Sequence, residues 1–223
     1  TNHESLYLND VTTLLNKIKL FGFYFATLDI RQDSRIHHTV FTTLVNTTYD
    51  KDLAIFPENY HTLSEAEQVK LLSELDQEID LSIIEDELVL NTLKTMKVVK
   101  QIQEQNGEKG ANRYIISNNQ TALNVMQLFA MLKLVAFKDK LTVDVVSLFE
   151  TVTDLTNAPK VMEQLYTNKA YRAHVATRGN KQTIMLGFSD GTKDGGYLMA
   201  NWSIYKAKEE LSAVAQQYGI DVV

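Results

Sequence analysis

Four charged side chains follow short apolar segments, and their types suit chemistry on an anionic substrate. Glu150 ends the segment "VVSLF", and Asp190 follows "MLGFS" with Lys193 three residues later. Two carboxylates with no His or Cys beside them suit a hard cation such as Mg²⁺, which takes its other ligands from water and substrate. Arg31, after "LDI", offers a planar fork to a phosphate or carboxylate, and Lys193 offers a movable point charge. These four residues predict a site for an anionic substrate.

Further polar residues stand at the ends of the same apolar segments. They are Asp29, Gln32, Asp33, Ser117, Asn118, Ser189 and Asp194. Taken singly, each charged residue is more often a solvated group at a strand end than a ligand. The prediction of a site therefore depends on their convergence in space.

The elements that must position these residues alternate between helix and strand. Helical spacing of apolar residues predicts helices over 6–20, 62–105, 121–133 and 197–218, and Pro159 suits the first turn of another. Short apolar segments predict five strands, at 21–31, 113–117, 141–150, 182–188 and 219–223. This alternation is typical of a parallel sheet covered by helices, so the fold class is α/β. An open doubly wound sheet and part of an eight-stranded barrel both remain possible, and both gather reacting groups at the carboxyl ends of the strands.

Composition narrows the classes of partner. The chain has 223 residues, 44% of them hydrophobic, with no linker-like stretch, and we interpret residues 1–223 as a single unit. A net charge of −6 without a dense Lys/Arg cluster argues against nucleic acid or an anionic membrane as the main partner. No apolar run is long enough to span a bilayer. The absence of cysteine and of a signal-peptide pattern at the start predicts a cytoplasmic protein that acts on small molecules.

Three familiar motifs are rejected. The segment from Asp190 to Gly195 begins like a calcium-binding loop, but Asn201 stands where that loop needs a bidentate Glu. An aspartate-dependent phosphatase would need its nucleophile at Phe188. His37 and His38 are neighbours that diverge by about 100° on a helix, so ordinary packing or surface histidines are expected.

Three segments together resemble the phosphoenolpyruvate carboxylase family: "LDIRQDS" followed by His37, "LFET", and "MLGFSDGTKDGGYLMANW". They occur in the family's order, and "YIISNNQTALNV" between the first two is also similar. The resemblance covers nearly the whole chain. It implies part of a TIM-type (α/β)₈ barrel with additional helices, about five parallel strands being present. It also implies a cytoplasmic, usually homotetrameric lyase that joins phosphoenolpyruvate and bicarbonate into oxaloacetate and phosphate.

The resemblance assigns roles to the same four residues. Glu150 and Asp190 match the ligands of Mg²⁺ or Mn²⁺, Arg31 matches a phosphate-site arginine, and Lys193 matches a lysine near the bicarbonate end. The chain departs from the family at Ile36, where an arginine is usual, and Arg35 lies one place earlier. Segments resembling "TAHPT" and the glycine-rich "GRGG" loop are absent from the sequence, so we expect an internal fragment that is inactive alone and self-associates through exposed strand edges.

Two other classes of function remain open. The same acids, Arg31 and Lys193 could belong to a non-catalytic α/β module that binds a phosphorylated metabolite with Mg²⁺. The chain could also be an interaction domain in which these polar groups have no ligand. Measuring the binding of Mn²⁺ and phosphoenolpyruvate separates these alternatives, because the interaction domain should bind neither ligand.

Overall fold

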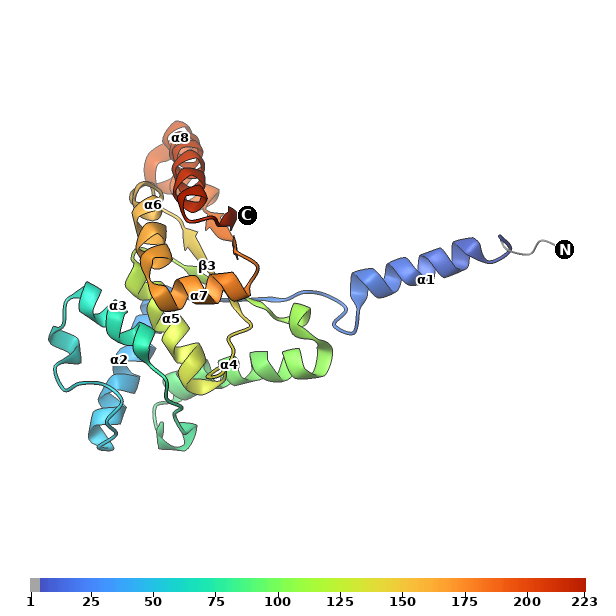
Figure 1. Ribbon diagram of the computed structural model, residues 1–223. Coiled ribbons are helices and arrows are strands. Elements are labelled where there is room, and N and C mark those ends of the chain that lie inside the picture. The colour runs from blue at the N-terminus through green and yellow to red at the C-terminus, as the bar shows by residue number, and fades with distance from the viewer. Residues whose placement is uncertain (1–4) are drawn as a thin grey trace.

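The computed structural model describes residues 5–223, and its centre is a four-stranded parallel sheet (Figure 1). The strands are β1 (Asp29–Asp33), β2 (Arg113–Ser117), β3 (Asp144–Phe149) and β5 (Ile184–Leu186), in the order β1-β2-β3-β5. All three pairings are parallel, so the carboxyl ends of the strands lie along one edge. The α/β class is confirmed. The sheet is open, with β1 and β5 at its edges, and the barrel remains a prediction with which this parallel sheet is compatible.

Two more short strands form a separate parallel pair, β4 (Lys181–Gln182) with β6 (Asp221–Val222). The prediction of one continuous strand over 182–188 is therefore wrong. The chain changes partner at Thr183: Gln182 pairs with Val222, whereas Ile184 pairs with Ser147 of β3. The side-chain amide of Gln182 donates to the carbonyl of Val145, 2.9 Å away, which holds the small sheet against the large one.

Helices cover one face of the main sheet. They are α2 (Ser34–Asp50), α3 (Glu65–Glu74), α4 (Glu87–Asn106), α5 (Ala122–Val135), α6 (Val152–Thr167), α7 (Lys169–Thr177) and α8 (Phe188–Gln217). Short 3₁₀ turns lie at Tyr60–Thr62, Leu81–Ile83 and Glu108–Gly110. Alternate strand residues such as Tyr114, Ile116 and Val145 join the large core under these helices. Helix α5 is buried along most of its length and forms the centre of this core.

The opposite face of the sheet carries a small apolar cluster made of strand residues alone. Its members are Ile115, Val146, Leu148 and Met185. Arg31 is in register with Ile115, and Glu150 follows Leu148 by two residues, so both belong to this face by the two-residue period of a strand. In a TIM-type barrel this is the face that points inward.

Three predicted boundaries are wrong. The strand predicted over 21–31 begins only at Asp29, because Gly22 and Phe25 adopt positive φ angles of 48° and 60° and turn the chain. The helical region predicted over 62–105 is two helices separated at residues 75–86, although the Ser64–Glu67 capping box begins α3 as predicted. Pro159 lies inside α6 and not in its first turn. A capping box of Thr151 and Asp154 fixes the start of α6 at Val152, seven residues before the proline.

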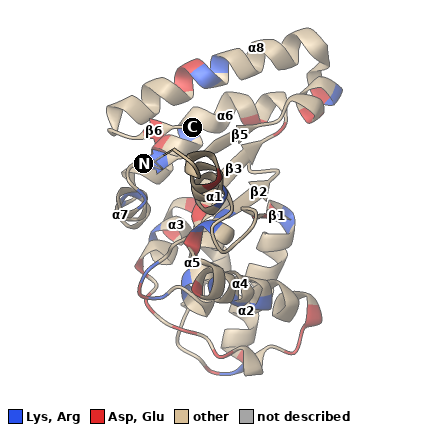
Figure 2. Cartoon of the chain, turned by 90° about the vertical axis from the view of Figure 1, so that its right-hand side faces the viewer, with Lys and Arg blue, Asp and Glu red and all other residues tan. Residues whose placement is uncertain are grey.

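Helix α1 (Leu8–Phe21) projects away from the rest of the molecule (Figure 1). It is predicted correctly from its periodicity, yet none of its residues is buried. Charged residues of both signs are interspersed along the other elements (Figure 2). No helix within residues 5–223 has the length and apolar character needed to cross a membrane.

Candidate functional site

The carboxyl edge of the sheet brings Arg31 and Glu150 together. Nη2 of Arg31 lies 3.1 Å from Oε1 of Glu150, although the residues are 119 positions apart. Arg31 comes from the middle of β1, and Glu150 is the first residue after β3. The side chain of Glu150 is only 14% exposed, whereas that of Arg31 is 52% exposed. The arginine therefore keeps a solvent-facing surface on which an anion can bind.

The second pair, Asp190 and Lys193, lies in the first turns of α8. Nζ of Lys193 is 2.8 Å from Oδ1 of Asp190. Lys193 lowers the pKa of Asp190 through this hydrogen bond and through its charge, and the charge of Arg31 lowers it further. The helical turn that carries this pair lies against Glu150, because Gly187 and Gly191, on either side of Asp190, approach the backbone of Glu150. The structure therefore brings the second pair close to the first, and the roles of the four residues stay predictions.

The residues from Phe188 to Asp194 form helix, which the sequence did not predict. Helix α8 begins at Phe188 and continues to Gln217, and Gly196, at φ 80° and ψ 167°, divides it into two parts. The predicted helix over 197–218 corresponds to the second part. Asp190 and Lys193 are therefore i, i+3 neighbours on one helical turn, which explains their direct contact.

Glycines allow this first part of α8 to approach Glu150. A Cβ atom at Gly187 would lie 3.1 Å from Cα of Glu150, and one at Gly191 would lie 3.4 Å from its carbonyl oxygen. The amide of Gly187 also donates to the carbonyl of Phe149 at 2.8 Å. Asp194 secures the far end by accepting a hydrogen bond from the amide of Val152 at 3.0 Å. The short side chains thus bring Asp190 to Glu150.

Compared with known protein families, residues 1–223 match phosphoenolpyruvate carboxylase. The chain belongs to the phosphoenolpyruvate carboxylase family. The match spans every residue from the "DIRQ" segment with Arg31 to the "FSDGTKD" segment with Asp190 and Lys193. It confirms the resemblance on which the roles of these residues were predicted.

The two carboxylates fit the divalent ion that phosphoenolpyruvate carboxylases are expected to use. Glu150 and Asp190 supply hard oxygen donors on segments that pack against each other, and the side chain of Asp190 is 49% exposed, which leaves room for water. Within residues 5–223 no group of three or more His, Cys, Asp or Glu side chains could enclose an ion. An ion held here would therefore take its remaining ligands from water and substrate, as Mg²⁺ commonly does.

At position 36, where the family resemblance leads one to expect an arginine, this chain has Ile36. Ile36 packs against the main core. Arg35 forms a two-point contact with Asp33, with Nη2 2.7 Å from Oδ2 and Nε 2.9 Å from Oδ1. Asp33 thereby holds Arg35 in the first turn of α2. His37 and His38, which were not expected to share a metal ion, lie in different environments. His37 is buried against Tyr114, and His38 is exposed.

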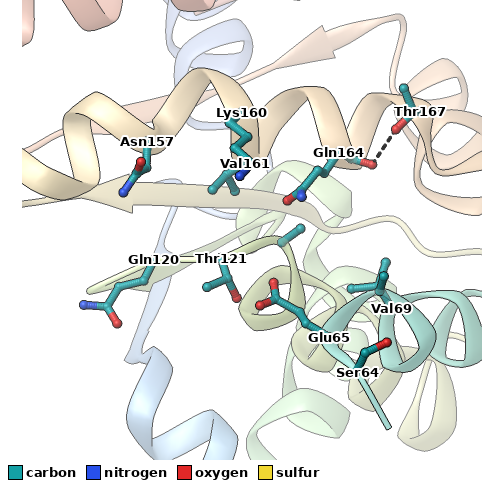
Figure 3. A pocket seen from close by; sticks show the side chains of 12 residues that line it. Ser64, Glu65, Val69, Gln120, Thr121, Asn157, Lys160, Val161, Gln164 and Thr167 are labelled. Atoms are coloured by element: carbon teal, nitrogen blue, oxygen red, sulfur yellow. Dashed lines mark hydrogen bonds between the residues drawn. The ribbon is translucent and has the colours of Figure 1, made fainter.

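A cavity of about 630 Å³ lies on the helical side of the sheet, between α3, the start of α5, and α6 (Figure 3). Glu65, Thr121 and Lys160 are among its lining residues, and none of the four predicted site residues is. Acidic and basic side chains do not converge among its lining residues as they do at the strand-end site. We therefore assign the chemistry to the carboxyl edge and not to this cavity.

Proposed function

We propose that this chain supplies the metal-binding and phosphate-binding part of an enzyme that carboxylates phosphoenolpyruvate with bicarbonate, giving oxaloacetate and phosphate. The convergence of Glu150, Asp190, Arg31 and Lys193 at one sheet edge carries the proposal. Membership of the phosphoenolpyruvate carboxylase family supports the choice of substrates.

In this proposal Glu150 and Asp190 hold Mg²⁺ or Mn²⁺. The ion would supply electrostatic stabilisation of the negative charge that develops on the substrate. The guanidinium of Arg31 binds oxygens of the phosphoryl group as it leaves the enol oxygen for bicarbonate. Lys193 places its ammonium beside the carboxyphosphate formed in that transfer, while the enolate of pyruvate remains to be carboxylated. Each basic residue is already paired with a site carboxylate, so both are positioned before substrate arrives.

We infer that turnover requires more than the residues at the carboxyl edge of this sheet. The sheet is open at β1 and β5, and its inner face has only a four-residue apolar cluster. We propose that further strands close it into a barrel, in a cytoplasmic homotetramer, and that oxaloacetate forms only in the closed protein. The present chain is expected to bind the ion and phosphoenolpyruvate without turnover.

Calorimetric titration with Mn²⁺ and then phosphoenolpyruvate tests this function. Wild type and Asp139→Ala should bind both, whereas Asp190→Ala should lose at least tenfold in Mn²⁺ affinity. Asp139 is an exposed carboxylate between α5 and β3 and serves as the matched control. Absence of Mn²⁺ binding in wild type would contradict the proposed site. Binding of both ligands without oxaloacetate formation in the closed protein would instead show a non-catalytic module.

A further inference from the structure

Glu150 is held by a second contact that none of the predicted site residues makes. The backbone amide of Asn118 donates to Oε2 of Glu150 at 2.5 Å, while Arg31 occupies Oε1. Arg31 is long and half exposed, so its end can move toward an anion. The Asn118 amide belongs to the main chain just after β2. Of the two contacts, the amide is therefore the one that fixes the orientation of the carboxylate.

Asn118, whose amide donates to Glu150, adopts a left-handed conformation with φ 53°. Asparagine tolerates this region better than most residues, whereas a β-branched side chain is strongly disfavoured there. The peptide that follows Asn118 is held at both of its polar atoms. Its carbonyl accepts a 2.6 Å hydrogen bond from Oγ of Ser34, and its amide, on Asn119, donates to the carbonyl of Leu148 at 3.1 Å.

Ser34 is well placed to hold this turn. It is the first residue of α2, is 3% exposed, and follows β1 directly. Its hydroxyl joins the end of β1 to the end of β2, and the Asn118 amide joins the end of β2 to Glu150 after β3. The chain of contacts crosses three adjacent strands at the edge where the site lies.

We propose that Ser34 is a positioning residue for Glu150, acting through the main chain of Asn118. The proposal rests on the function proposed above, in which Glu150 is a ligand of the divalent ion. Without the Ser34 hydroxyl, the Asn118 carbonyl loses a buried donor, and only the Asn119 amide still holds this peptide. The turn is then held less firmly, and the contact from the Asn118 amide to Glu150 weakens. Hydrogen bonds that orient a metal ligand, made by groups that do not bind the metal themselves, typically contribute about ten- to a hundredfold to metal affinity.

Nuclear magnetic resonance and Mn²⁺ titration of Ser34→Ala test the proposal. In wild type the Asn118 amide proton should resonate downfield and exchange slowly with solvent, because it is hydrogen-bonded to a carboxylate. Ser34→Ala should shift this resonance upfield, accelerate its exchange and weaken Mn²⁺ binding about tenfold. Thr39→Val is the matched control, because Oγ1 of Thr39 also donates to a main-chain carbonyl in α2 but lies on an exposed residue away from Glu150. The control should change neither property.

A second pair of variants keeps the test informative if Ser34→Ala unfolds. Asn118→Val cannot adopt φ 53° without strain and should weaken Mn²⁺ binding more than Asn118→Gly, which can. An unchanged Asn118 amide in folded Ser34→Ala, or equal Mn²⁺ affinities in the two Asn118 variants, would overturn the role of Ser34. If the amide responds as expected but wild type binds no Mn²⁺, the positioning contact stands and the proposed function fails.

Discussion

Arg31 and Glu150 form an ion pair at 3.1 Å that uses a carboxylate oxygen also suited to a metal ion. A divalent ion at Glu150 must therefore compete with the guanidinium for Oε1. Arg31→Met should strengthen Mn²⁺ binding by roughly three- to tenfold, the order expected when one nearby positive charge is removed from a solvent-screened site. The same variant should weaken phosphoenolpyruvate binding. Calorimetry with each ligand measures both effects, and weaker Mn²⁺ binding would contradict the competition.

Lys193 should control the ionisation of Asp190. The hydrogen bond and charge of Lys193 are the main reasons that the pKa of Asp190 lies below its ordinary value of 3.8. The stabilisation is therefore present above about pH 3.8 and is lost as the pH falls through the lower pKa of the folded state. Lys193→Met should raise the pKa of Asp190 toward 3.8, as measured by carbon-13 resonance of its carboxyl group. Lys206→Met removes a similar pair with Glu209 and should leave Asp190 unchanged.

Gly187 should be needed for the approach of α8 to Glu150. In Gly187→Ala, the new Cβ would lie 3.1 Å from Cα and 3.2 Å from Cγ of Glu150, so one of the two segments must move. We expect a loss of about 1–3 kcal/mol in the free energy of unfolding, together with weaker Mn²⁺ binding. Gly191→Ala should have smaller effects, because its nearest contact would be an ordinary 3.4 Å. Urea unfolding and Mn²⁺ titration of both variants provide the comparison.

His37 should make the protein less stable in acid. Burial lowers its pKa from 6.5 to about 4, so the unfolded chain binds a proton at a higher pH than the folded chain does. The free energy of unfolding should therefore fall between pH 6.5 and pH 4, by an amount on the order of 3 kcal/mol for this residue. His174, whose pKa is also lowered to about 4 by burial, should contribute similarly.

Urea unfolding at pH 7 and pH 4.5 tests the effect of His37. His37→Phe should reduce the acid-induced loss by about half, although it also removes the 3.2 Å contact with the Tyr114 hydroxyl and lowers stability at both pH values. His61→Phe alters an exposed histidine and should retain the full loss. An identical decline in wild type and His37→Phe would show that His37 is not the source.

Helix α1 should mediate self-association. Val11, Leu14 and Ile18 are each about 60% exposed on one side of a helix that contacts little of the described chain. Sedimentation at increasing concentration should show assembly in wild type and less assembly in Ile18→Glu. Asn16→Glu places the same charge on the opposite side of the helix and should assemble like wild type. A wild-type monomer at high concentration would contradict this prediction.

The sequence by itself determined the chemical types of the site and most of the elements that carry them. Strand β2 was predicted at its observed bounds because its β-branched residues lie between clear turn signals. Glu150, directly after β3, could be recognised because a parallel sheet places all its carboxyl ends along one edge, whereas Arg31, predicted near the end of a strand, lies in the middle of β1. Local propensity and the period of apolar residues are properties of short segments, so they could be read without knowing the fold.

Only the tertiary structure decided which groups touch. Ser34 and Asn118 are far from Glu150 in sequence. Both contacts involve main-chain atoms, and the type of a residue does not predict which main-chain hydrogen bonds it makes. The division of residues 182–188 between two sheets depends on which strands are available as partners, and no periodicity encodes that choice. The helical turn at Asp190 forms because glycines allow it to pack against Glu150, a contact set by distance in space.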